Sequence, residues 1–137
     1  MTIVENKALV LHIVEELWNE HNLDVIDQYF HPDFRNVDPA NFLITDRESL
    51  KEFSRQLFEA FPDWHATVHE LVAEDNRVVK VWSVEGNFKN DIFTIPANHK
   101  PIRYSGINLY RLKDGLVIEE IWAQDFMGLM EQLGVAD

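Results

Sequence analysis

Residues 77–86 read RVVKVWSVEG, a run of β-branched and aromatic side chains that is typical of a β-strand. Three further stretches alternate with the period of two that a strand requires: residues 64–73, 101–112 and 116–124. Turn-forming residues join the four stretches in pairs, at Glu74-Asp75-Asn76 and at Lys113-Asp114-Gly115. The pattern predicts two antiparallel hairpins, which together supply most of one sheet.

Helical spacing precedes these strands. Apolar residues recur at steps of one and three over residues 6–20 and predict a broad amphipathic helix. A shorter helix is expected over residues 23–30, ended by the His31-Pro32 step, because a residue before proline avoids the helical conformation. Residues 45–48 read TDRE, a capping-box pattern that predicts a third helix reaching Pro62.

The end of the chain predicts one more helix, over residues 126–133, which Gly134 ends. A short edge strand is expected at residues 91–95. Helices followed by hairpins and a closing helix predict the α+β class. We therefore expect a cone-shaped domain in which the N-terminal helices pack on a strongly curved antiparallel β-sheet, with a short C-terminal helix.

The 137 residues contain no internal repeat and no linker, so we expect a single domain over residues 1–137. Twelve Lys and Arg against 24 Asp and Glu give a net charge of −12, which repels nucleic-acid phosphates and anionic lipid headgroups. We therefore expect neither nucleic acid nor a membrane as a partner. The first residues lack the basic start and continuous apolar stretch of a secretion signal, and we expect a cytoplasmic protein.

Neither a metal nor a cofactor is expected. The chain has no cysteine, which removes thiolate ligands and iron–sulfur clusters, and its five glycines form no phosphate-binding loop. His65 and His69 are four residues apart. In a strand this spacing spans about 13 Å, which is too far for one ion to bridge.

A cone-shaped space between helices and a bent sheet can hold an apolar ligand. The chain has four Trp, three Tyr and nine Phe to line or fill such a space. Two interpretations stay open for each aromatic residue, namely that it fills the core or that it lines a ligand cavity. The residues expected to shape a cavity are Trp18, Trp64, Trp82, Phe88 and Trp122.

Asp125 is the leading candidate for catalysis, because it lies where the last strand meets the last helix, beside Trp122 and Phe126. Burial among apolar side chains would raise the pKa of its carboxyl group above the usual value of about 4 and suit it to proton transfer near neutral pH. The alternative is structural, because aspartate is a preferred N-cap residue of a helix. The local sequence leaves both roles open.

Several short motifs, in this order along the chain, make the sequence similar to the SnoaL-like polyketide cyclases. They are Trp18-Asn19-Glu20, Phe30-His31-Pro32-Asp33-Phe34, Phe58-Glu59-Ala60-Phe61-Pro62-Asp63, Ser105-Gly106-Ile107-Asn108-Leu109-Tyr110-Arg111 and Asp125-Phe126-Met127-Gly128-Leu129. The resemblance covers nearly the whole chain and implies a fold like that of nuclear transport factor two. It also implies ring closure by intramolecular aldol condensation without metal or cofactor, with Asp125 removing and returning the proton.

Such chemistry needs a hydrogen-bond donor that faces the developing oxyanion. Asn108 supplies one if its side chain points inward, and Tyr104 and Tyr110 share its side of the strand. The alternative is that these side chains form cross-strand pairs on the outer face.

The sequence departs from the family at Val37, Val81 and Phe88, where relatives often carry a histidine, an arginine and a histidine. We therefore expect these three residues to belong to a pocket that is more hydrophobic than usual, with a small, largely apolar substrate. The alternative is a non-catalytic protein that binds a small hydrophobic ligand on the same fold.

A homodimer through the sheet is also expected. Relatives commonly pair through their sheets, and the strand at residues 77–86 has apolar side chains on both of its faces, with Val79 and Val81 alternating with Val78 and Trp82. Apolar residues on both faces suit a strand with a core on one side and a partner on the other.

Overall fold

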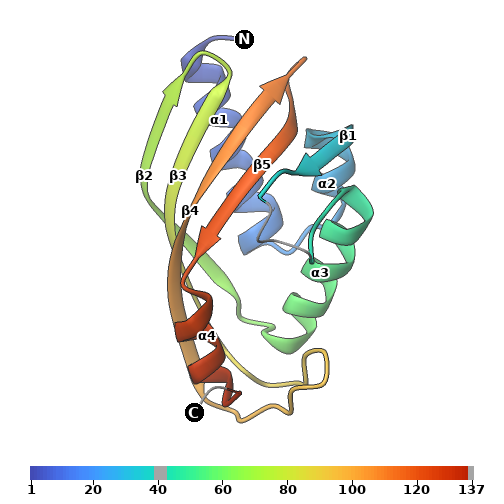
Figure 1. Cartoon of the computed structure of the whole chain (residues 1–137), viewed down its shortest axis with the longest axis vertical. Helices are drawn as coiled ribbons and strands as arrows, with labels where there is room; N and C mark the ends of the chain where they lie inside the picture. The colour runs from blue at the N-terminus through green and yellow to red at the C-terminus, as the bar shows by residue number, and fades with distance from the viewer. Residues whose placement is uncertain (39–42, 136–137) are drawn as a thin grey trace.

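The structure is a computed structural model that describes residues 1–38 and 43–135. The elements in chain order are α1 (Ile3–Ile13), the π-helix η1 (Val14–Asn19), α2 (Asp24–Tyr29), β1 (Phe30–Asn36), α3 (Arg47–Ala60), β2 (His65–Glu74), β3 (Arg77–Asn87), β4 (Pro101–Lys113), β5 (Leu116–Gln124) and α4 (Phe126–Leu133). Figure 1 shows a strongly curved sheet with α4 at the end away from the N-terminus. The predicted α+β class is confirmed. No helix in the described ranges is long and apolar enough to cross a membrane.

Five strands form one open sheet in the order β1-β5-β4-β3-β2. β2 pairs antiparallel with β3, and β4 with β5, as the hairpin signals predict. β3 also pairs antiparallel with β4, which joins the two hairpins into one sheet. β1 is an addition, because it pairs parallel with β5 and makes the sheet mixed. Pro32 cannot donate a ladder hydrogen bond, so it is tolerated only at an edge or an irregularity. β1 provides both, since the register shifts between Phe30 and Arg35.

The two hairpin turns follow the chemistry of their residues. Asp114 and Gly115 have φ values of 53° and 76°, the left-handed pair that a two-residue hairpin turn needs. Asp75 has a φ of 53° in the other turn. The edge strand predicted at residues 91–95 is wrong, because Ile92 and Ile95 form only an isolated bridge with each other.

The first helix begins earlier than its apolar pattern indicates and ends in a wider coil. Thr2 and Glu5 form a capping box that starts α1 at Ile3. Over η1 the backbone is π-helical, so an amide donates to the carbonyl five residues before it. The Glu20 amide, for example, donates to the Glu15 carbonyl oxygen at 2.9 Å. π-Helical turns of this kind are frequent at functional sites, and this one carries Trp18 into the core.

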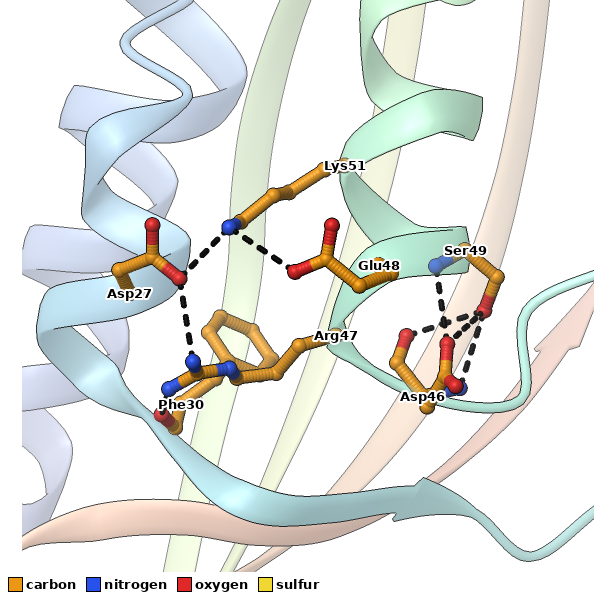
Figure 2. A network of polar contacts seen from close by, with 7 residues as sticks. All are labelled: Asp27, Phe30, Asp46, Arg47, Glu48, Ser49 and Lys51. Carbon is orange, nitrogen blue, oxygen red and sulfur yellow. Dashed lines mark hydrogen bonds and ion pairs between the residues drawn. The ribbon is translucent and has the colours of Figure 1, made fainter.

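Capping and ion pairs fix the start of α3 (Figure 2). The cap is Asp46 rather than the predicted Thr45, and its carboxylate accepts from the Ser49 amide at 2.9 Å. Asp27 on α2 lies 2.7 Å from the Lys51 ammonium and 3.3 Å from the Arg47 guanidinium. These contacts orient α3 against α2, although exposed ion pairs contribute little stability one by one.

The inner face of the sheet, defined here as the face toward the helices, carries the core. Alternate residues of β3 are buried there: Val78, Lys80, Trp82 and Val84. The corresponding residues of β4 are Ile102, Tyr104, Asn108, Tyr110 and Leu112. The outer face carries the intervening side chains, among them Val79, Val81 and Ile107.

Gly106 interrupts the inner face because Trp82 lies over it. The two residues are cross-strand partners, and a Cβ atom on Gly106 would overlap the Trp82 ring and the Ala123 carbonyl oxygen. Neither overlap is sterically possible, so a side chain at this position must displace the indole or separate β4 from β5.

Gly106→Ala is expected to lower the free energy of unfolding by about 1–3 kcal/mol through overpacking. Urea denaturation followed by circular dichroism measures the change. Ser105→Ala, at the exposed preceding position, is the matched control and should change stability by less than about 0.5 kcal/mol. Equal stability of both variants would contradict the close approach of Trp82.

Candidate functional site

A small internal cavity lies between η1, α3 and the inner face of the sheet. Its volume is about 20 Å³, which is room for about one water molecule. The cavity is lined by Val14, Trp18, Leu57, Trp64, Ala66, Val68, Lys80, Trp82, Val84, Tyr104, Asn108 and Trp122. All but a few of these side chains are apolar or aromatic.

Aromatic rings form most of the wall and pack edge-on or tilted against one another. The Trp122 ring centre is 6.2 Å from that of Trp18 and 6.5 Å from that of Trp82. The Tyr104 ring centre is 5.7 Å from that of Trp82 and 5.9 Å from that of Trp64. Rings with few rotatable bonds make a wall of defined shape.

Buried polar side chains on three adjacent strands form a network next to the cavity, and three of them, Lys80, Trp82 and Asn108, line it. The Trp82 indole nitrogen donates to Asn108 Oδ1 at 2.5 Å, and Asn108 Nδ2 donates to Glu120 Oε1 at 2.6 Å. The Lys80 ammonium lies 5.3 Å from the centre of the Tyr110 ring. We call these five residues the buried polar network, because each side chain is less than one-tenth exposed.

Burial sets the protonation behaviour of the two charged members. It raises the pKa of Glu120 to about 7, against the opposing effects of the Lys80 charge and of hydrogen bonds from Asn108 and Tyr110. It also lowers the pKa of Lys80 to about 8, against the attraction of Glu120. Burial thus moves the pKa of the carboxyl group upward and that of the amine downward, both toward neutral pH, which is the direction that suits proton transfer.

The cavity wall also contains hydrogen-bond donors without acceptors. The indole N–H groups of Trp64 and Trp122 are buried and have no partner within the described part of the chain. A buried donor without a partner costs about 1–3 kcal/mol. The wall therefore suits a ligand that is apolar and carries an acceptor such as a carbonyl oxygen.

Six of the residues expected to bind substrate lie together in this wall: Trp18, Trp64, Trp82, Tyr104, Asn108 and Trp122. Three others do not line the cavity. Val81 alternates with Lys80 and Trp82 and therefore faces outward. Phe88 is fully buried, but its ring stacks on Phe61 at 5.1 Å. Val37 is 41% exposed beyond the end of β1.

Asp125 lies at the surface, where it caps α4. Its carboxylate accepts from the Gly128 amide at 3.0 Å, and its side chain is not part of the cavity wall. A Cβ atom on Gly128 would overlap this carboxylate, so a larger residue at that position would require the Asp125 side chain to shift. Of the two roles that the sequence leaves open for Asp125, the geometry supports the structural one.

Lys80 and Glu120 are functional candidates that the sequence analysis does not identify. Lys80 is two residues before Trp82 in β3, so the two side chains point to the same face of the sheet. This spacing could have identified Lys80 as an inward-facing residue. Glu120 is harder to predict, because Glu119 precedes it and either residue could face inward. The register decides between them: Glu120 pairs with buried Tyr110, whereas Glu119 pairs with Arg111, whose guanidinium lies 3.7 Å from its carboxylate.

Within the described ranges, no cluster of three or more His, Asp or Glu side chains could hold a metal ion. His65 and His69 are both exposed on β2, and His69 is 2.7 Å from the Ser83 hydroxyl oxygen.

A sequence model described as SnoaL-like polyketide cyclase matches residues 8–133. Three solved structures share the fold. AclR, a candidate hydroxylase from Streptomyces galilaeus, is 23% identical with a TM-score of 0.88, over 99% of this chain and 89% of its own. TsrD from Streptomyces laurentii is 24% identical with a TM-score of 0.86, over 98% of each chain. A candidate polyketide cyclase from Acidithiobacillus ferrooxidans is 27% identical with a TM-score of 0.83, over the full length of both chains. No curated protein is significantly similar in sequence.

The charged pair of the network should give the protein a local stability minimum between pH 7 and 8. Folded Glu120 holds a proton that the unfolded chain releases above its usual pKa of 4.5, so its contribution to stability falls as the pH rises from 4.5 to about 7. Folded Lys80 releases its proton at about 8 rather than 10.5, so its contribution falls as the pH drops from 10.5 to about 8.

The double variant Lys80→Met/Glu120→Gln removes both titrating groups and keeps an acceptor for Asn108. We measure the free energy of unfolding of parent and variant by urea denaturation from pH 5 to 10 and subtract the value of the variant from that of the parent. This difference should be lowest at pH 7–8. Its slope on either side is at most about 1.4 kcal/mol per pH unit. Lys100→Met, at an exposed lysine, should show no such curvature, and a flat difference for the double variant would contradict the assigned protonation.

Proposed function

The chain belongs to the SnoaL-like polyketide cyclase family, and from this premise we propose that it catalyses cofactor-independent proton transfer on a small, largely apolar carbonyl compound. The reaction is an intramolecular aldol cyclisation or a related step that starts with removal of a proton next to a carbonyl group. The cavity beneath the four tryptophans is the proposed site.

One observation carries this proposal: Lys80 is a titratable amine in a wall that is otherwise aromatic or apolar apart from Asn108. Its neutral form is a base of suitable strength near pH 8. Trp64 and Trp122 line the same cavity, and their buried indole N–H groups have no partner within the described residues. In the proposed site these N–H groups hold the oxygen atom on which charge develops.

In the proposed mechanism, the neutral Lys80 amine takes the proton from the carbon next to the substrate carbonyl. The electron pair moves onto the carbonyl oxygen, where the indole N–H groups stabilise the enolate. The enolate carbon then attacks a second carbonyl carbon of the same molecule, and Lys80 returns the proton to the new alkoxide. Glu120 is a positioning residue in this scheme, since it accepts from Asn108 and its charge favours the protonated amine.

A substrate larger than a water molecule has to displace part of the wall, because the cavity volume is about 20 Å³. Trp122 is the side chain best placed to move. It is half-buried, whereas Trp18, Trp64 and Trp82 are each more than nine-tenths buried. We propose that substrate enters where Trp122 turns toward solvent.

The apolar lining also supports the second candidate function, a binding protein that holds a small hydrophobic ligand without transforming it. The aromatic wall is the same in both cases. The two functions differ in whether a bound ketone exchanges its hydrogens.

Deuterium exchange tests the proposal. Acetone and cyclohexanone are incubated with protein in D₂O at pH 8, and loss of the hydrogens next to the carbonyl is followed by proton NMR. We expect catalysed exchange in the parent and a loss of about 100-fold in Lys80→Met, because that variant lacks the base. Lys113→Met, at an exposed lysine, is the control and should keep the parental rate.

Asp125→Asn decides between the two candidate acid/base groups in the same assay. Exchange that survives in Asp125→Asn and is lost in Lys80→Met supports the cavity amine. The reverse result would return the role to Asp125, as the family resemblance implies. Quenching of tryptophan fluorescence by the ketones without any exchange in the parent would favour the binding protein.

A homodimer through the outer face of the sheet is part of the proposal. Apolar side chains adjoin one another there across three strands, with Val79 beside Leu109 and Leu109 beside Ile121. Ile107, partnered with Val81, is 49% exposed. A second copy of the chain would cover these adjoining apolar side chains.

Sedimentation velocity at micromolar concentration should show a dimer for the parent and a monomer for Ile107→Glu, which places a charge in the apolar area. Leu11→Glu introduces the same charge at another exposed position, on α1, and should remain dimeric. A monomeric parent would exclude this interface.

A further inference from the structure

We propose that Lys80 is a covalent nucleophile, which binds the substrate carbonyl as a Schiff base and so replaces the free carbonyl as the electron acceptor of the reaction. The inference rests on the proposed function, because it concerns the same cavity and substrate class. In this inference Lys80 acts as a nucleophile whose Nζ is covalently bonded to the substrate, rather than as a base.

The environment of Lys80 differs from that of the other lysines. Its side chain is 4% exposed and lines the cavity, and its ammonium nitrogen lies 5.3 Å and 6.0 Å from the ring centres of Tyr110 and Trp82. No carboxylate oxygen in the described ranges is within the 4.0 Å of an ion pair. The other five lysines, at positions 7, 51, 89, 100 and 113, are half-buried or exposed.

This setting favours an uncharged, nucleophilic amine. Desolvation by aromatic neighbours disfavours the ammonium form, and such lysines in hydrophobic pockets form Schiff bases with carbonyl substrates. Attack on a carbonyl carbon develops negative charge on its oxygen, which needs hydrogen-bond donors. The Trp64 and Trp122 indole N–H groups in the cavity wall are without partners within the described residues and can serve as these donors.

The covalent steps balance without any oxidant or reductant. The lone pair of neutral Nζ forms a bond to the carbonyl carbon, and the nitrogen passes one of its protons to the oxygen to give a neutral carbinolamine. A proton from solvent then converts the hydroxyl group into a leaving water molecule, which leaves an iminium. The carbon next to the iminium releases a proton to that water and becomes an enamine. The enamine carbon forms the new bond to a second carbonyl carbon of the substrate, and the resulting alkoxide takes the released proton back from the water. Addition of water to the iminium that this step regenerates restores the carbonyl group, and the free amine and the proton borrowed from solvent are released.

The competing explanation is that Lys80 and Glu120 are a structural charge pair. A buried pair of this kind can stabilise one packing arrangement without reacting. The two explanations predict opposite reactivity, because a structural lysine is shielded from reagents and a nucleophilic lysine is the first to react.

Reductive trapping separates them. The full-length protein is incubated at pH 7.5 with acetone and sodium cyanoborohydride, which reduces an iminium to a stable isopropyl-lysine, and each lysine is then followed by peptide mass spectrometry. At this pH the neutral fraction of an amine with a pKa of about 8 is at least about 100-fold that of an ordinary lysine. We expect Lys80 to be labelled at least about 10-fold faster than any other lysine.

Two variants sharpen the result. Lys80→Met should lose the fast label and keep the slow labelling of the exposed lysines. Glu120→Gln keeps an acceptor for Asn108 but removes the carboxylate that favours the ammonium form, so Lys80 should be labelled faster at pH 7 than in the parent. Labelling of Lys80 no faster than that of the exposed lysines would overturn the proposal.

The deuterium-exchange assay keeps the proposed function separate from this inference. Exchange of acetone hydrogens without a trapped adduct at Lys80 would overturn covalent catalysis and leave proton transfer in place. An adduct without exchange would support the nucleophilic amine and overturn the proposed proton-transfer function.

Discussion

A line of hydrogen bonds from Trp82 through Asn108 to Glu120 crosses three adjacent strands, and the inner face of the sheet depends on it. Both hydrogen bonds need the register that sets these side chains on one face, because a slip of one residue would turn every side chain to the other face. Gly106 permits the same arrangement, because a residue without a side chain leaves room for the Trp82 ring. Register, packing and polar contacts are therefore mutually dependent at this site.

Placing a lysine and a glutamate inside this fold opposes stability, because burial disfavours both charged forms. Part of the cost is offset by attraction between the two groups and by hydrogen bonds to the carboxylate from Asn108 and Tyr110. The part of the desolvation cost that is not offset raises the pKa of Glu120 and lowers that of Lys80. An arrangement that is unfavourable for folding thus lowers the pKa of a buried amine, and such displaced pKa values are common at functional sites.

The fold and the site carry different information about function. The curved sheet with its covering helices is shared with proteins less than 30% identical to this chain, and one fold can host unrelated activities. The chemistry has to be argued from the cavity, where an apolar wall, unpartnered indole donors and one buried amine meet. Hydrophobic residues at Val37, Val81 and Phe88 bear less on this cavity than the family comparison implies, since none of the three lines it.

The sequence by itself determined the α+β class, the four antiparallel strands and the capped last helix, because period-two alternation, turn residues and Gly134 are local signals. It also indicated aromatic residues that could line a cavity, but it left open whether they do so and whether Asn108 faces inward. Only the tertiary structure decided that β1 joins the sheet, that Asp125 is a surface cap, and that Glu120 rather than Glu119 is buried beneath the cavity with Lys80. These facts depend on strand register and on contacts between residues far apart in the chain, and no local pattern of apolar and polar residues encodes them.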